Sequence, residues 1–475
     1  MRRHRPPLKF WIGWSDKARN RTFPGREWRE CGALTYLQRT AKFCPDGGEP
    51  RADRFRRWNS IRNFRVIQSL DNEEEKRLST NSRKKIIVVI GTRPEGIKLA
   101  PVVLELKKHQ SEFETQICVT GQHREMLDQM LGVFGLLPDY DLEVMKAGQD
   151  LSGVTSACVT GLDRILRQEC PALVLVQGDT TTTFAAALAA YYNHVPVGHV
   201  EAGLRTGKKN DPFPEEINRR LATQLSDFHF APTEVAQNNL LSEGVSPENI
   251  SVTGNTVIDA LLLTQARLAA YPGLAHDPLG ETDGLRIILV TAHRRESFGL
   301  PFRRICEAIR ALAEKRRDVL IVYPVHLNPN VQVPVRETLD GIPNVKLIAP
   351  LDYVSFVACM QRAYILLTDS GGIQEEGPAL HKPVLVMREV SERPEAIAAG
   401  TACLTGTDPE RIVAAANSLL DDPDCYKRMT SRPNPYGDGH AAERIAQFLL
   451  SRLTDKSGAR SFETASLNLN RSASA

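Results

Sequence analysis

Four short polar segments stand where apolar runs end, at the points where parallel strands would finish. They are residues 91–95 (GTRPE), 177–183 (QGDTTTT), 199–206 (HVEAGLRT) and 369–376 (DSGGIQEE). In open α/β sheets, ligands collect at the carboxyl ends of the strands. The four segments therefore predict one shared site.

Apolar strands alternate with helical patterns from residue 84 onward. A first series predicts strands at 85–90, 115–119, 173–176, 195–199 and 228–230, with helices at 96–108, 150–168, 181–192 and 215–225. A second series follows a helical stretch at 257–268 and a linker at 271–284, with strands at 285–290, 319–324, 345–348, 365–368 and 384–387. Alternating strands and helices predict parallel, doubly wound sheets. We expect an α/β protein of two Rossmann-like domains with a cleft between them.

The domain borders follow from these patterns. We expect a basic N-terminal extension at 1–83, Rossmann-like domains at 84–256 and 257–437, a C-terminal helix at 438–453 that crosses back to the first domain, and a disordered tail at 454–475. The extension carries 20 Lys and Arg against 10 Asp and Glu, and it contains all four tryptophans without a periodic apolar pattern. It is too acidic for a transit peptide. We interpret it as a non-native upstream segment or as an added partner- or RNA-binding segment.

The basic character belongs to the N-terminal extension, so we do not expect the rest of the chain to bind nucleic acid. The whole chain carries a formal charge of +3, so the part beyond residue 83 is near −7. Nine cysteines without a C-x-x-C spacing indicate reduced thiols rather than a disulfide framework. No apolar run is long enough to span a membrane, and no secretory signal is evident. We expect a soluble, cytoplasmic protein.

Two of the polar segments are suited to binding an anion. Residues 91–96 lead into a helix N-terminus, and Arg93 and Lys98 add positive charge. Residues 369–372 repeat the arrangement at a second strand end, and Glu376 follows where it could accept hydrogen bonds from both hydroxyls of a ribose. Alternatively, residues 91–96 form an ordinary turn, and Glu376 only complements the dipole of its helix. Neither segment matches the NAD fingerprint or the ATP phosphate loop, so a nucleotide diphosphate without hydride chemistry fits best.

Three carboxylates and one histidine are candidates for acid/base chemistry. Asp179, Glu201 and Glu215 stand at or just after predicted strand ends, where like charges shift pKa values. Asp179 could instead cap the next helix, and Glu215 could be a first-turn acid of its own helix. His293 lies among arginines, which favour the neutral imidazole and suit it to proton transfer near a phosphate. No His pair stands at metal-ligand spacing, so we expect no metal and no cofactor.

In its motifs, the chain resembles the non-hydrolysing UDP-N-acetylglucosamine 2-epimerase family from residue 85 to about 453. The segments that carry the resemblance stand in order: GTRPE-IK, GDTTTT, HVEAGLRT, PEE-NR, HRRES, VHLNPNV, TDSGGIQEE, ERPE and NPYGDG. The resemblance implies a fold of the glycosyltransferase B type and reversible conversion of UDP-N-acetylglucosamine to UDP-N-acetylmannosamine through elimination of UDP. It also implies a homodimer and a place in surface polysaccharide synthesis.

The resemblance assigns roles to particular residues. It implies an acid/base set of Asp179, Glu201 and Glu215, a ribose contact at Glu376 and a uracil contact at Phe356. The diphosphate region would be held by Arg93, Lys98, His293, Ser370, Gly371, Gly372 and Arg393.

The chain departs from the family pattern at four positions. Gln177 stands where some relatives carry His, and Asp211 stands where Ser is frequent. Glu125 and Gly148 occupy the positions through which some members bind an activating second substrate, which makes such activation doubtful.

The alternative functions are a UDP-sugar glycosyltransferase of the same fold, a sensor of the nucleotide sugar, and a 2-epimerase of a 2,3-diacetamido uronic sugar nucleotide.

Overall fold

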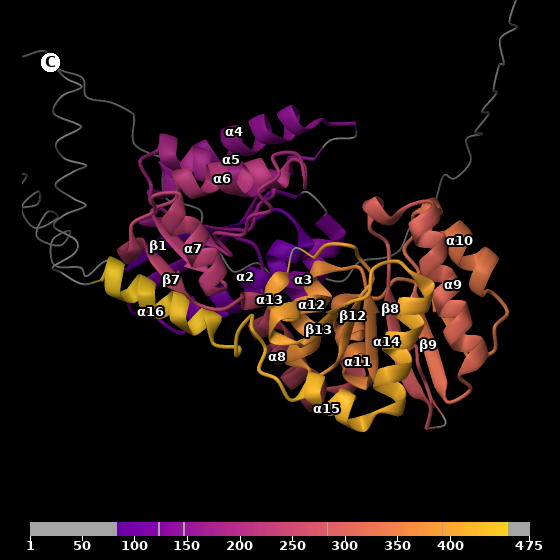
Figure 1. The fold of residues 1–475 in the computed structure, drawn as a ribbon. Coiled ribbons are helices and arrows are strands. Elements are labelled where there is room, and N and C mark those ends of the chain that lie inside the picture. The colour runs from indigo at the N-terminus through magenta and orange to yellow at the C-terminus, as the bar shows by residue number, and fades with distance from the viewer. Residues whose placement is uncertain (1–82, 122–123, 146–147, 283, 392, 455–475) are drawn as a thin grey trace, which may run out of the picture. The chain divides into compact units, whose positions relative to one another are not determined.

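The computed structural model describes residues 83–454, apart from 122–123, 146–147, 283 and 392 (Figure 1). The predictions for the N-terminal extension and the C-terminal tail concern segments that lie outside the described residues, except for their inner ends. In the part of the chain that the structure describes, no helix combines the length and apolar character that crossing a membrane requires.

The first half of the described chain forms a seven-stranded sheet in which neighbouring strands are parallel. The strand order is β3-β2-β1-β4-β5-β6-β7. Its strands are β1 (Lys84–Ile90), β2 (Phe113–Val119), β3 (Tyr140–Asp141), β4 (Leu173–Gln177), β5 (Val197–Val200), β6 (Phe228–Ala231) and β7 (Ile250–Val252). Its helices are α2 (Arg93–Leu106), α3 (Arg124–Val133), α4 (Leu151–Glu169), α5 (Thr181–Tyr192), α6 (Glu215–Leu225) and α7 (Glu234–Ser242).

The second half forms a six-stranded parallel sheet of order β10-β9-β8-β11-β12-β13. Its strands are β8 (Arg286–Thr291), β9 (Val319–Pro324), β10 (Val345–Ile348), β11 (Ile365–Thr368), β12 (Val384–Val386) and β13 (Ala402–Leu404). Its helices are α8 (Thr256–Ala270), α9 (Leu300–Lys315), α10 (Pro329–Leu339), α11 (Tyr353–Arg362), α12 (Gly371–Ala379), α13 (Pro394–Ala399), α14 (Pro409–Asp421) and α15 (Pro423–Thr430), and α16 (Ala441–Leu453) ends the described chain.

The predicted fold class is confirmed, because two parallel sheets alternate with helices as expected. Each predicted strand is present, and those at 319–324, 345–348 and 365–368 have the predicted bounds. Three strands were missed, namely β3, β7 and β13. Each has only two or three residues and pairs at a sheet edge, where one neighbour is enough and a short segment shows no periodicity.

The strands of the first sheet are apolar because helices cover both of its faces. All five residues from Ile86 to Ile90 are at most 1% exposed, which is the continuous buried pattern of a central parallel strand. Alternate residues contact opposite faces, so Ile86 and Val88 belong to one apolar cluster while Ile87 and Val89 belong to another. Burial on both faces fixes the register of β1 and hence the position of the loop that follows it.

The last helix, α16, returns to the first sheet (Figure 1). Its Phe448 ring packs edge-on against Phe228 and Phe230 of β6, with ring centres 5.5 and 5.4 Å apart. The Asp259 carboxylate on α8 accepts a hydrogen bond from the N–H of Ala442 at 2.8 Å. The C-terminal helix therefore packs on the first sheet.

A glycine after β5 allows the chain to pass against α7. Gly203 has φ +90°, and an added Cβ would lie 2.2 Å from the carbonyl oxygen of Ala236. Gly207 also has a positive φ, +74°, but nothing lies within 4 Å of an added Cβ there. A side chain at Gly203 would therefore meet both steric overlap and backbone strain, whereas a side chain at Gly207 would meet backbone strain alone.

We predict that Gly203→Ala lowers the free energy of unfolding by about 3 kcal/mol or more, because it adds a clash with backbone to the strain of a positive φ. Gly207→Ala should cost only about 1 kcal/mol, since it adds strain alone. Denaturant unfolding of both variants checks this. Equal losses of stability would contradict the steric argument.

Candidate active site

The carboxyl ends of β1, β4 and β5 are neighbours in the sheet, and a buried carboxylate lies among them. Glu201, directly after β5, accepts hydrogen bonds from Lys98 Nζ at 2.6 and 2.7 Å and from Gln177 Nε2. Burial alone would raise the pKa of Glu201, but the adjacent Lys98 and Arg393 outweigh it and hold that pKa below its ordinary value. Glu201 is therefore an ionised carboxylate with both oxygens occupied.

Asn255 connects this carboxylate to the second sheet. Its side-chain Nδ2 donates to Glu201 Oε1 at 2.9 Å and to Glu375 Oε2 at 3.2 Å, while its Oδ1 caps α8. Glu375, in α12, is paired in turn with the guanidinium of Arg393. Lys98, Glu201, Asn255, Glu375 and Arg393 form one buried charge cluster that spans the ends of both sheets.

Asp179 follows β4 and lies in a different environment. Its carboxylate pairs with Arg219 of α6 at 2.5 Å, and its side chain is 26% exposed. Loss of solvent raises the pKa of Asp179, and the attraction of Arg219 does not fully offset this. Asp179 does not cap α5, because that role belongs to Thr180.

Glu215 begins α6 and is the least constrained of the three predicted carboxylates. It is partly buried, and among the described residues its Oε2 has no hydrogen-bond partner. The structural role at this helix start belongs to Glu216, which accepts from the N–H of Thr206 and pairs with Arg219 and Arg220. Buried oxygens normally have a hydrogen-bond partner, and a bound ligand could supply one here. Glu215 therefore remains a candidate for contact with substrate.

In the first predicted anion loop, several groups expected to face a ligand are already bound to carboxylates of the protein. Two of its backbone N–H groups, at Gly91 and Thr92, donate to Glu95 Oε2 at 3.0 and 2.6 Å and so do not face a ligand. Lys98, also predicted to bind the anion, is paired with Glu201. Arg93 is partly buried and, within the described part of the chain, makes no ion pair with an acidic residue. In this structure the free positive charge of the loop therefore resides on Arg93.

The second predicted anion loop leads into the N-terminus of α12. Ser370 precedes α12 without capping it through its side chain, and Gly371 and Gly372 form the first turn. The carboxylate of Asp369 accepts from the N–H groups of His293 and Arg294, both at 2.7 Å. An added Cβ on Gly371 would lie 3.6 Å from Arg294 Nη2, so this guanidinium lies beside the helix N-terminus. Arg294 and the N-terminal dipole of α12 together suit an anion.

His293 lies at the edge of the same loop. Its ring stacks on that of His326, with centres 5.2 Å apart. The side chain remains accessible to solvent, yet partial burial lowers its pKa more than the neighbouring Asp369 raises it. The neutral imidazole expected from the sequence is consistent with this environment.

Glu376 and Phe356, predicted to contact the nucleoside, come from different helices. Phe356 is partly buried on α11, against the main apolar cluster. Glu376 is 8% exposed, and its Oε2 is unpartnered among the described residues. Burial, with the charge of Glu375 beside it, raises the pKa of Glu376 to about 8. It is thus mostly neutral at pH 7 in the absence of a donor.

Sequence reasoning missed several members of the site. Glu375 and Gln177 lay within the quoted motifs, but nothing in their spacing showed that they would join Glu201. Asn255 belongs to no motif, and its signal was only that of a helix cap. His199 donates from Nε2 to the carbonyl of Gly178 at 2.7 Å, while burial lowers its pKa to about 3. This neutral ring holds the loop that carries Asp179.

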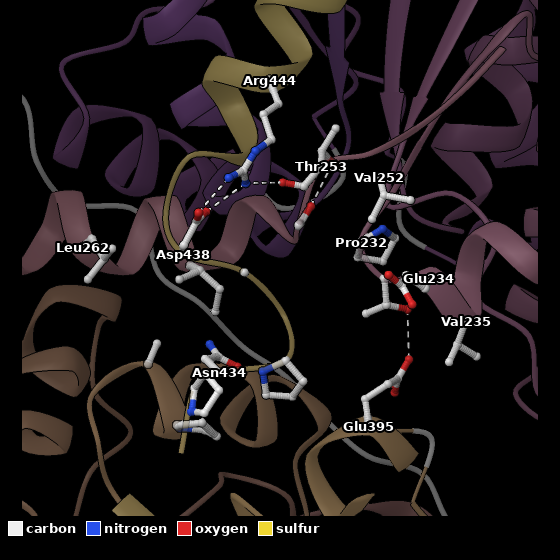
Figure 2. A pocket seen from close by; sticks show the side chains of 18 of the residues that line it. Pro232, Glu234, Val235, Val252, Thr253, Leu262, Glu395, Asn434, Asp438 and Arg444 are labelled. Atoms are coloured by element: carbon white, nitrogen blue, oxygen red, sulfur yellow. Dashed lines mark hydrogen bonds and ion pairs between the residues drawn. The ribbon is translucent and has the colours of Figure 1, made fainter. Parts of the chain in front are cut away.

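The described residues also enclose a cavity of about 780 Å³ that is separate from these groups (Figure 2). Thr233 of the first half donates a hydrogen bond to Glu395 at 3.0 Å on one side of it, and Arg444 pairs with Asp438 on another. None of the predicted site residues lines this cavity. Among the described residues, no group of three or more His, Cys, Asp or Glu is arranged to hold a metal ion.

Two parallel sheets with acidic and anion-binding groups at their facing strand ends define an α/β enzyme of the glycosyltransferase B architecture. Residues 104–450 match the family model described as UDP-N-acetylglucosamine 2-epimerase, and the chain belongs to this family.

Individual relatives are similar over the same region. The UDP-N-acetylglucosamine 2-epimerases of Salmonella typhimurium and Escherichia coli K12 are 53% and 52% identical to this chain, and each match covers 77% of this chain and 98% of the relative. A crystal structure of the UDP-GlcNAc 2-epimerase of Neisseria meningitidis, bound to UDP-GlcNAc, superposes with a TM-score of 0.71 at 47% identity. It covers 77% of this chain and 100% of that protein. The family predicted from the motifs is thereby confirmed.

The raised pKa of Glu376 predicts a pH-dependent cost to stability. An acid whose pKa is higher in the folded state than in the unfolded state destabilises the fold as pH rises from the unfolded value of 4.5, and the loss levels off above about 8. Glu376→Gln removes this cost. We expect its stability relative to the unaltered protein to rise by up to about 1.4 kcal/mol per pH unit across that window.

Denaturant unfolding between pH 5 and 9 measures this difference. Asp438→Asn is the matched control, because pairing with Arg444 lowers the pKa of Asp438. The stability that this pair contributes is present above the unfolded pKa of 3.8 and is lost only in acid, so the control difference should stay flat between pH 5 and 9. If the stability difference between Glu376→Gln and the unaltered protein does not change with pH, the raised pKa of Glu376 is contradicted.

Proposed function

We propose that the protein reversibly converts UDP-N-acetylglucosamine to UDP-N-acetylmannosamine by inverting C2 of the sugar. In the forward direction the bond from C1 to the UDP oxygen breaks, and the C2 proton passes to a carboxylate. The products of this step are UDP and a glycal. UDP then adds back to C1, and a proton returns to C2 on the opposite face.

The anion loops suit the first half of this reaction. UDP leaves C1 only if its new negative charge is stabilised. Arg93, Arg294 and the N-terminus of α12 supply positive potential, and neither arginine pairs with a carboxylate among the described residues, which supports their role in holding the diphosphate. His293 and Arg393, together with Ser370, Gly371 and Gly372, complete the set that we propose for this region.

The carboxylates suit the second half. Proton removal from one face and return to the other needs groups on both sides of the ring. We assign proton transfer to Asp179 and Glu215, because the first has a raised pKa and the second has an unpartnered oxygen. Glu201, ionised and bound to Lys98, supplies fixed charge within the same acid/base set.

The observation that carries the proposal is the contrast between two adjacent strand ends. Asp179 follows β4 and Glu201 follows β5, yet the pKa of the first is raised and that of the second is lowered. Carboxylates in one site with pKa values shifted in opposite directions are typical of acid/base chemistry. The similarity to 2-epimerases over most of the chain supports UDP-N-acetylglucosamine as the substrate of this chemistry.

Incubation with UDP-N-acetylglucosamine in deuterium oxide tests the reaction. We expect deuterium at C2 together with UDP-N-acetylmannosamine. Asp179→Asn should slow this exchange by about 10³-fold, because it removes a proton carrier. Its affinity for UDP should change only a few-fold. Nuclear magnetic resonance of the sugar and calorimetry of UDP binding provide the two measurements.

Asp227→Asn is the control for loss of a carboxylate from the first sheet. Asp227 accepts from the N–H of Val197 at 2.8 Å at the amino ends of β5 and β6, opposite the strand ends that carry the site, so exchange should persist. Normal turnover by Asp179→Asn would remove it from the proposed set. If the unaltered protein yields UDP and a glycoside, it is a transferase, and an unchanged substrate would indicate a sensor.

We also propose a homodimer that acts in the cytoplasm and supplies surface polysaccharide synthesis. Helices α4, α5 and α6 pack side by side, and Tyr191 and Tyr192 on α5 are each 60% exposed. Two adjacent exposed aromatic side chains on one helix of this group support an interface there. Light scattering should give twice the chain mass. Replacing both tyrosines by Glu should shift the protein toward a monomer, and an unshifted dimer would place the interface elsewhere.

A further inference from the structure

Glu95 is a buried carboxylate that the proposed reaction does not use. It is 2% exposed, and it stands in the first turn of α2 within the first anion loop. Removal of a carboxylate from water is costly unless hydrogen bonds replace the lost hydration. The partners that replace it here come from two separate loops.

The two oxygens of Glu95 face different segments. Oε2 accepts from the N–H groups of Gly91 and Thr92, at 3.0 and 2.6 Å, within its own loop. Oε1 accepts from the hydroxyl of Thr180 at 2.6 Å and lies 3.1 Å from that of Thr183, both in the loop and first turn after β4. The carboxylate thus joins the loop that carries Arg93 to the loop that carries Asp179.

A helix cap alone does not explain this arrangement. In a capping box, the acid at the third helical position needs only the N–H of the cap residue, here Thr92. The second oxygen of Glu95 is free of that task, yet it points across to α5 rather than to solvent. The cross-loop bonds are therefore additional to the cap.

Neighbouring contacts extend the same connection to β5. The hydroxyl of Thr183 also lies 2.6 Å from the carbonyl of Gln177, whose side chain bonds Glu201. Lys98, one turn further along α2 than Glu95, binds both oxygens of Glu201. The first turns of α2 are therefore bound to the ends of both β4 and β5.

We propose that Glu95 is a positioning residue that holds Arg93 and Asp179 in one rigid frame. Arg93 would bind the departing diphosphate and Asp179 would move the C2 proton, so their relative position decides whether both events occur together. The inference rests on the proposed function. Misplacement of one reacting group by about 1 Å costs on the order of 10²-fold in rate, whereas binding of UDP alone does not need Asp179.

Thr180→Val tests the frame with little change of shape. Valine keeps the branched side chain but lacks the hydroxyl that reaches Glu95. We expect turnover of UDP-N-acetylglucosamine to fall about 10- to 100-fold while the dissociation constant for UDP changes less than about twofold. Steady-state kinetics and calorimetry separate the two effects.

The matched control is Asp408→Ala. Thr180 also caps α5 by accepting from the N–H of Thr183, and Asp408 caps α14 by accepting from the N–H of Arg411. The control therefore removes a helix cap without touching the frame. An equal fall in turnover for both variants, or normal turnover by Thr180→Val, would overturn the proposal.

Substitutions of Glu95 itself distinguish hydrogen bonding from bulk. In Glu95→Gln, the amide oxygen can accept from the two N–H groups while the amide nitrogen donates to Thr180, since a hydroxyl both donates and accepts. Glu95→Met has similar length and no polar atom that can form these bonds. We expect the Gln variant to retain turnover within about threefold and the Met variant to lose about 100-fold or more.

Equal turnover by folded Gln and Met variants would overturn the proposal. If the Met variant does not fold, the comparison of Thr180→Val with Asp408→Ala decides alone. Failure of the proposed function is a separate outcome, because the unaltered protein would then form no UDP-N-acetylmannosamine. In that case UDP binding still tests the frame. Glu95→Met should then weaken the binding of UDP by removing the contribution that Arg93 makes to it.

Discussion

The buried charge cluster at the junction of the two sheets is the interaction on which the site depends. Glu201 and Glu375 lie between Lys98 and Arg393, and Asn255 donates to both carboxylates. Removal of four charged groups from water costs several kcal/mol for each ion, so the cluster is tolerable only because each member is paired and hydrogen-bonded. Loss of any one of the four ions would leave an uncompensated charge.

The cluster also determines which charges remain for a ligand. Within it, two carboxylates balance two cations, so it adds little net potential at the strand ends. The positive potential at the site then comes from Arg93, Arg294 and the N-terminus of α12, and the acids that we propose to react are Asp179 and Glu215. A nucleotide diphosphate and a proton-transfer step can thus be accommodated without breaking the contacts that join the sheets.

Much of the fold was predictable, because buried parallel strands have long apolar runs and clear helical partners. The strand at 365–368 was predicted with its bounds, and so was the polar segment after it. The side-chain contacts were less predictable, since they depend on how strand ends lie side by side. Lys98 was expected at the diphosphate but is paired with Glu201, and Glu95, whose motif was quoted, showed no sign of reaching Thr180.

The adjacent acids Glu375 and Glu376 show why residue type alone cannot assign a role. Consecutive residues on a helix point about 100° apart, so the two side chains enter different surroundings. Glu375 pairs with Arg393, whereas Glu376 forms no ion pair and has no partner for Oε2 among the described residues. The first belongs to the scaffold of the site, and the second retains the oxygen with which a ribose hydroxyl could pair. Because such a bond favours the ionised carboxylate, nucleoside binding and loss of a proton from Glu376 should be coupled.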